Sequence, residues 1–175
     1  MAYGDVLSNL YLLDQVDAWS PSQKLLALAA LAPKHFLADP ALSARLLNLN
    51  EAKLMAAAEP TTNNGDRTRL GDFFEALVAL SRQTYAAAND AQVSHFRDHD
   101  GRHEIDFIIH RGHTEAVGFE VKLKSSITDR DVRHLLWLNE SLPDQIADLV
   151  IIDTGAHAYR RQDGVAVIPL TLLTA

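Results

Sequence analysis

The residues best suited to chemistry are charged side chains in the middle of two strand-like stretches. The first stretch, HEIDFIIH at 103–110, contains Asp106, and the second, EAVGFEVKL at 115–123, contains Glu120 and Lys122. Because an isolated charge is costly to bury, such residues are normally paired with an opposite charge or bound to a metal ion. Two carboxylates beside an ammonium group can hold a divalent cation and stabilise negative charge on a bound group.

The period of a strand decides which of these side chains can meet. Residues two apart share a face, so Glu120 and Lys122 lie on one face of the second strand, and its other face is apolar. In the first strand Asp106 and Ile108 share a face, and Ile105 lies on the opposite one. If the strands are neighbours, the three charged residues converge. The alternative is an ordinary ion pair of Lys122 with Glu120 or Asp106 on a solvent-facing side of the sheet.

A third carboxylate comes from a predicted helix. The stretch LGDFFEALVALSRQTY at 70–85 has the apolar spacing of an amphipathic helix. Glu75 lies between Gly71 and Ala79 in a stripe of small residues, which allows close approach and presents one carboxylate. The alternative is an exposed glutamate at the edge of such a helix.

The elements that must position these residues follow from periodicity and turn signals. A start resembling a capping box, Thr128 with Asp131, begins a second helix, and DLVIID at 148–153 is apolar enough for a strand covered on both faces. Strands are predicted at 92–96, 103–110, 115–123, 148–153 and 164–170, and helices at 70–85 and 128–142. This order predicts an α/β fold in which a mixed sheet, closed by the last strand, is flanked by helices.

The N-terminal part predicts a small helical subdomain. Residues 3–32 resemble a helix, although LYLLDQVDAW equally fits a short strand. KHFLADP is extended, and Asp39-Pro40 begins a short helix. The predicted organisation is a helical subdomain at 1–57, with a winged-helix-like remnant as one interpretation, a polar linker at 58–69, and a main domain at 70–175.

The order of a helix with Glu75, a strand with Asp106 and a strand with Glu120-x-Lys122 resembles the PD-(D/E)xK phosphodiesterase core, which has the restriction-endonuclease-like fold. The segments GDFFEALV, GRHEIDFII, AVGFEVKL, RDVRHLLWL and GVAVIPL together resemble the nuclease-like C-terminal domain of a large family of bacterial and archaeal AAA-type ATPases. KHFLADPALSARLL resembles the segment before that domain, so the resemblance covers at least residues 34–175.

The resemblance implies that Glu75, Asp106 and Glu120 bind one or two Mg²⁺ or Mn²⁺ ions, with the carbonyl of Val121 as a further ligand. It also implies that Lys122 orients or activates the attacking water. The implied function is a divalent-metal-dependent phosphodiesterase, a nuclease-like domain for which DNA is favoured over RNA as the substrate. The alternative is a non-catalytic nucleic-acid- or protein-binding regulatory module of an ATPase. The P-loop signature G-x-x-x-x-G-K-[ST] is absent from this sequence, so ATP hydrolysis is not implied.

Composition limits the function classes further. The chain has 175 residues, 47% of them hydrophobic, and a net charge of −7. An acidic protein is poorly suited to tight binding of a phosphate backbone, so we expect weak nucleic-acid binding through local cations. Candidates for such contacts are Lys124, Arg130, Arg133, His134, Arg160 and Arg161. Trp137, among leucines, is expected in the core.

Other sites and locations are less favoured or excluded. His110-x-x-His113 lacks a third zinc ligand at a usual spacing. The absence of cysteine fits a reduced, cytoplasmic location. The longest apolar run, LLALAALA at 25–32, is too short to span a bilayer, so no membrane partner is expected. If the protein is instead a regulatory module, we expect the N-terminal helices around Leu25–Leu31 to bind a protein partner, such as an ATPase.

Overall fold

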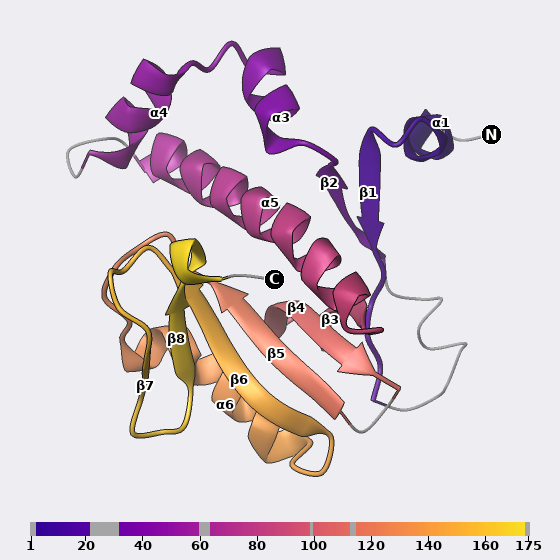
Figure 1. Ribbon diagram of the computed structural model, residues 1–175, viewed down its shortest axis with the longest axis vertical. Helices are drawn as coiled ribbons and strands as arrows, with labels where there is room; N and C mark the ends of the chain where they lie inside the picture. The colour runs from indigo at the N-terminus through magenta and orange to yellow at the C-terminus, as the bar shows by residue number, and fades with distance from the viewer. Residues whose placement is uncertain (1–2, 22–31, 60–63, 99, 113–114, 174–175) are drawn as a thin grey trace. The chain divides into compact units, whose positions relative to one another are not determined.

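The computed structural model describes residues 3–21, 32–59, 64–98, 100–112 and 115–173 (Figure 1). The chain divides into two compact units. The first contains Met1–Gln15 and His35–Ser81, and the second contains Val16–Lys34 and Arg82–Ala175. Each unit is therefore assembled from two separate stretches of sequence, and the first unit interrupts the second.

The first unit is mainly helical. Its elements are α1 (Tyr3–Asn9), α3 (Pro40–Leu46), α4 (Glu51–Ala58) and most of α5 (Asn64–Ala88), with a two-stranded sheet of β1 (Leu13–Val16) and β2 (Lys34–Leu37) at its border. As predicted, α3 begins at Pro40, and Oδ1 of its cap residue Asp39 accepts the Ala41 N–H at 2.8 Å. Helix α4, which was not predicted, is capped in the same way by Asn50.

Two features of this region differ from the prediction. Helix α5 begins at Asn64, so the polar stretch 58–69 is not a loop throughout. Residues 3–32 are not one helix, because α1 ends at Asn9 and the strand β1 follows, which is the alternative that the sequence allowed. Residues 22–31 lie outside the described part of the chain, and the division into domains at 58–69 stays a prediction.

The second unit contains a mixed sheet of six strands in the order β3-β4-β5-β6-β8-β7. The strands are β3 (Gln92–Arg97), β4 (Glu104–Arg111), β5 (Glu115–Val121), β6 (Ile146–Asp153), β7 (Tyr159–Arg160) and β8 (Ala166–Pro169). β3, β4 and β5 are antiparallel neighbours, β5, β6 and β8 are parallel, and β7 is antiparallel to β8. The predicted α/β class and strand order are confirmed, but the unpredicted β7 takes the edge expected for β8. A short 3₁₀ helix, η1 (Leu170–Leu172), follows β8.

Helix α6 (Asp129–Ser141) joins β5 to β6 and covers one face of the sheet (Figure 1). Parallel neighbours need such a crossover. The predicted cap is confirmed, because Oδ2 of Asp131 accepts the Thr128 N–H at 2.8 Å. The helix approaches β5 closely at Gly118, where an added Cβ would lie 3.2 Å from Leu135 Cδ2 and 3.3 Å from Leu138 Cδ2.

The opposite face of the sheet receives the C-terminal end of α5. There the guanidinium carbon of Arg82 lies 3.8 Å from the centre of the Phe107 ring, a cation–π contact. The sheet is therefore flanked by helical residues on both faces.

A β-bulge changes the predicted alternation of β4. The pairing of β3 with β4 shifts by one residue between Ser94 and Phe96. Ile105 and Ile108 consequently both belong to the buried cluster that contains Leu135 of α6, although residues three apart in a regular strand would face opposite ways. The prediction that they lie on opposite faces was therefore wrong.

The stretch before β2 completes this core. Val16 and Trp19 are buried, and Trp19 N–H donates to the carbonyl of His95 on the edge strand β3 at 2.7 Å. Ala18 forms an isolated parallel bridge with the same residue. The segment therefore covers part of the edge of the sheet as well as its core.

Candidate active site

The charged residues meet where two neighbouring strands diverge. The ladder between β4 and β5 extends to the pair of Phe107 with Phe119 and ends there. Beyond this pair, the Val121 N–H would donate to a backbone carbonyl of β4 in a regular ladder. It donates instead to the side-chain Oδ2 of Asp106 at 2.9 Å. Lys122 Nζ donates to Glu120 Oε2. The structure thus brings Asp106, Glu120 and Lys122 into one group.

The charged face of β5 is the more deeply buried one. Glu120 is only 3% exposed, and its neighbours on that face, Ala116 and Gly118, are also buried. Phe119 on the opposite face is only partly buried. The sequence also allowed an ordinary ion pair of Lys122 with Glu120 on a solvent-facing side of the sheet. The ion pair is present, but this face of β5 is buried.

Burial and charge together shift the protonation of this group. Burial and the negative charge of Asp106 raise the pKa of Glu120 to about 8, against the opposing effect of Lys122. Burial alone would lower the pKa of Lys122, but the charges of Glu120 and Asp106 raise it above its ordinary value. At neutral pH Lys122 therefore stays charged, and burial favours the protonated form of Glu120. The expectation that crowded carboxylates raise a pKa is confirmed, with burial as the larger cause.

Lys34 is a second cation at this site, and the sequence did not indicate it. Its Nζ lies 3.5 Å from Asp106 Oδ1 and 3.0 Å from Glu104 Oε1. It ends the Val16–Lys34 stretch of the second unit, far from the strands of the large sheet in sequence. Asp106 is therefore held between the backbone of β5 and an ammonium group.

Aromatic and imidazole rings of α6 and the loop before β4 adjoin the charged group. His103 stacks on Trp137 with ring centres 3.8 Å apart and an interplanar angle of 5°, and it meets His134 edge-on at 5.4 Å. Burial and the charge of Arg133 lower the pKa of His134, with smaller effects of Lys122 and Asp106. His134 thus lies near the carboxylates as a neutral ring. Trp137 is half-buried and engaged by His103, which agrees with packing rather than base stacking.

Most other predicted phosphate contacts already have carboxylate partners. Lys124 pairs with Asp131 at 2.5 Å, Arg160 with Asp148 at 2.8 Å, and Arg161 with Asp129 at 2.6 Å and Asp163 at 3.0 Å. These cations can reach a phosphate only by giving up those pairs. Arg130 is exposed, and Arg133 Nε donates to His134 Nε2 at 2.9 Å.

For the remaining predicted ligands no contact with this group is described. Glu75 lies on α5 within the first unit, so its role as a ligand stays a prediction. The contact of Val121 with Asp106 uses its N–H, and the role of its carbonyl also stays a prediction. His110 contacts Ser94 and the carbonyl of Gly112, and His113 lies outside the described residues. Within the described ranges, no cluster of three or more His, Cys, Asp or Glu side chains is arranged to hold a metal ion.

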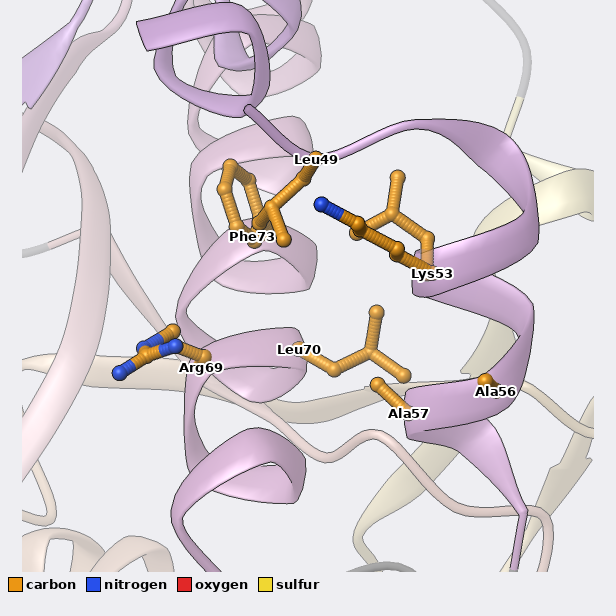
Figure 2. Close-up of a pocket in the computed structure, with 8 residues that line it drawn as sticks. Leu49, Lys53, Ala56, Ala57, Arg69, Leu70 and Phe73 are labelled. Atoms are coloured by element: carbon orange, nitrogen blue, oxygen red, sulfur yellow. The ribbon is translucent and has the colours of Figure 1, made fainter. Parts of the chain in front are cut away.

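A second candidate site is an apolar groove in the first unit, between α4 and α5 (Figure 2). It has a volume of about 330 Å³ and is lined by Leu49, Lys53, Leu54, Ala56, Ala57, Arg69, Leu70 and Phe73. Figure 2 shows Lys53 reaching across one end of the groove toward Leu49 and Phe73, whereas Arg69 points away from α4. The groove therefore combines an apolar floor with positive charge at its margin.

The helices beside this groove bury little of their apolar surface. Neither α3 nor α4 contains a buried residue. Leu46, Leu47 and Met55 are 66%, 58% and 65% exposed.

The fold and the charged site define an α/β protein with a carboxylate–lysine group at the divergent ends of two sheet strands. The chain belongs to the family described as Domain of unknown function (DUF4143), whose model matches residues 70–173. This domain is often found in the C-terminal regions of AAA-type ATPases. No curated protein and no solved structure matches the chain. No helix in the described part of the chain is long and apolar enough to cross a membrane.

Proposed function

We propose that this protein is a divalent-metal-dependent phosphodiesterase, a DNA-nuclease-like domain with a restriction-endonuclease-like arrangement of its sheet. The observation that carries the proposal is the meeting of Asp106, Glu120 and Lys122 where β4 and β5 diverge. These are three of the four residues that the PD-(D/E)xK resemblance assigns to catalysis. We place the domain in the cytoplasm, in line with the absence of cysteine.

The donor set fits a hard cation. Mg²⁺ retains several waters and binds one or two carboxylates beside a substrate phosphate, which matches Asp106 and Glu120. Because Glu120 holds its proton at neutral pH, binding must displace that proton, and affinity should rise with pH toward about 8. A bound Mg²⁺ or Mn²⁺ ion would supply Lewis-acid stabilisation of negative charge on the phosphate.

The chain's own residues then have distinct roles. Lys122, which stays charged, donates hydrogen bonds to the attacking water or to the negative charge that develops on the phosphate. Lys34 balances the charge of Asp106 and holds that carboxylate against β5. The buried cluster beneath α6 keeps the strands in place, as precise catalytic geometry requires.

The proposal includes weak, salt-sensitive binding of nucleic acid, with DNA preferred to RNA. A chain of net charge −7 must rely on local cations, and several of the candidate arginine and lysine residues are already paired. Lys34, Lys122 and Arg133 are the cations near the site. Binding by so few contacts should fall steeply as salt is raised.

The test is a cleavage assay on single-stranded, double-stranded and branched DNA with Mg²⁺ or Mn²⁺. Lys122→Ala should reduce cleavage at least about 100-fold, the loss typical when one transition-state donor is removed. The fold should be retained, because Lys122 is not part of the buried cluster. Lys53→Ala, in the other unit, is the matched control and should cleave like the wild type. Absence of metal-dependent cleavage by the wild type on every substrate would sink the catalytic proposal.

A second candidate function is a non-catalytic regulatory module that binds a protein partner such as an ATPase. The groove between α4 and α5 and the exposed Leu46, Leu47 and Met55 favour it. This function predicts no cleavage, full tolerance of Lys122→Ala, and loss of partner binding in Leu70→Glu. The two functions are therefore separated by reciprocal variants, one in each unit.

A further inference from the structure

Asp153 is a buried carboxylate to which the proposed function gives no role. It ends β6 and is 1% exposed. Its Oδ1 atom has no hydrogen-bond partner among the described residues. Burying a polar oxygen without a hydrogen-bond partner costs free energy. A side-chain rearrangement that gives Asp153 Oδ1 a partner would therefore be favoured.

The register of the sheet places Asp153 beside Lys122. β5 and β6 pair in parallel, with Glu120 next to Ile151 and Val121 next to Ile152. The ladder continues one step, because Lys122 N–H donates to the Ile152 carbonyl at 2.9 Å. Neighbours in a parallel ladder share a face, so Lys122 and Asp153 lie side by side on the face of Glu120.

The chain after β6 closes over this carboxylate. A Cβ at Gly155 would lie 2.8 Å from Asp153 Oδ2, so the residue at 155 must be glycine for the turn to pass this close. Asp153 is 1% exposed, so a partner for its free oxygen is sought among neighbouring side chains of the protein. Lys122, next to it in the ladder, carries a long flexible side chain that can change partner.

We propose that Asp153 is a positioning residue that accepts the ammonium group of Lys122 when Asp106 and Glu120 take up a divalent cation. This inference rests on the proposed function. In the structure Lys122 occupies Glu120 Oε2, and its positive charge opposes a second cation at the same oxygen. By moving to Asp153, Lys122 frees that oxygen and gives the buried carboxylate its missing partner. Lys122 also remains beside the site.

The test is Mn²⁺ binding by the full chain, measured by isothermal titration calorimetry. Asp153→Asn has the same shape but no charge to attract Lys122. We expect its dissociation constant for Mn²⁺ to rise about 10-fold, the lower end of the range for residues that support metal ligands. Its melting temperature without metal should stay close to that of the wild type, because asparagine keeps the shape of aspartate at this buried position. Asp148→Asn, at the other end of β6, is the control and should bind Mn²⁺ normally.

A double variant separates this role from a structural one. In Lys122→Met no ammonium group has to move, so adding Asp153→Asn should not weaken Mn²⁺ binding further. As a second readout without any change at position 153, the ¹³Cγ resonance of Asp153 should shift when Mg²⁺ is added to the wild type but not to Lys122→Met.

Three results would overturn the exchange: wild-type affinity in Asp153→Asn, an equal loss in the Lys122→Met background, or an unchanged Asp153 resonance in the wild type. If the wild type binds Mn²⁺ and only these tests fail, the proposed function survives. If the wild type binds no Mn²⁺, the proposed function and the exchange are both wrong.

Discussion

The charged group of the second unit and the groove of the first unit are opposite exceptions to the usual distribution of residues. Glu120 is ionisable yet 3% exposed, whereas Leu46 is apolar yet 66% exposed. Proteins normally pair their buried charges and limit contiguous exposed apolar surface. The proposed functions would account for both exceptions: a cation and phosphate at the charged group, and an apolar partner surface at the groove.

The two regions also differ in how tightly the elements around them are packed. The charged group lies on strands packed against Val132, Leu135 and Leu138 of α6, which are all fully buried. The groove is formed beside α4, which contains no buried residue. A packed scaffold is suited to chemistry, which needs fixed geometry, and lightly packed helices are suited to an adaptable interface.

The largest expected effect contrasts the apolar residues of the two regions. Leu135→Ala should lower the free energy of unfolding by about 2–5 kcal/mol, because it leaves a cavity in the core beneath the site. Leu47→Ala, at a leucine that is 58% exposed, should change it by no more than about 0.5 kcal/mol. Urea unfolding of both variants measures the difference. Comparable losses would mean that the apolar surface near the groove is buried in the folded protein.

A smaller effect concerns the metal. Mn²⁺ at 100 times its dissociation constant should stabilise the wild type by about 2.7 kcal/mol. For a chain of this size that is a rise in melting temperature of roughly 5–10 °C. Asp106→Asn should remove the rise, and Lys53→Ala should retain it. A thermal melt with no shift in the wild type would reduce the site to an ordinary ion pair.

The pH dependence of the free energy of unfolding should show the raised pKa of Glu120. Its pKa is about 8 in the folded protein against an ordinary value of 4.5, so between these values the folded state holds a proton that the unfolded chain releases. This contribution to stability is fully present below pH 4.5 and is lost as pH rises through 8. Between pH 6 and 8, the free energy of unfolding of the wild type should fall by on the order of 1–2 kcal/mol more than that of Glu120→Gln.

Chemical denaturation of both proteins at a series of pH values measures this difference. Burial lowers the pKa of His95 and of His134 below 6.5, and their effect on stability has the opposite sign. It is common to both proteins and cancels in the comparison. Parallel pH profiles for the wild type and Glu120→Gln would show that the carboxyl group is ionised at neutral pH.

The smallest expected effect is at the groove. The fluorescent probe 8-anilinonaphthalene-1-sulfonate combines an apolar body with a negative charge, which matches the apolar lining and Lys53. Its affinity should fall a few-fold in Lys53→Ala and further in Leu70→Glu, and it should be unchanged in Lys122→Ala. Equal binding by all four proteins would show that the probe does not occupy the groove.

Local patterns were sufficient to predict much of the fold. Strands β3, β4, β5, β6 and β8, the crossover helix and its cap at Thr128 depend on periodicity and hydrogen bonds within a few residues, and these were predicted. The bulge that moves Ile105 to the face of Ile108 depends on pairing with β3, so a single strand could not reveal it. The early start of α5 was missed because its first turns are polar.

The candidate site divides in the same way. Asp106, Glu120 and Lys122 were singled out because each is a charged residue in a strand-like stretch, and a period of two places Glu120 and Lys122 on one face. Lys34 was missed because the His35–Ser81 part of the first unit separates it from Asp106 in sequence. Asp153 was read as the end of an apolar strand, since nothing local distinguishes a buried carboxylate from one at a turn. The depth of Glu120 beneath α6 is likewise a property of the tertiary structure.

The interrupted sequence of the second unit has a consequence for defining the protein's boundaries. The family match begins at residue 70, but the unit that contains the sheet also includes Val16–Lys34. A fragment cut at residue 70 would contain every strand of the large sheet and yet lack Trp19, which is 3% exposed in the intact chain. Such a fragment should be prone to aggregation, because its apolar core and the edge of β3 would both be uncovered. The contiguous stretch that the family model matches therefore leaves out Val16–Lys34, which belongs to the same compact unit as the large sheet.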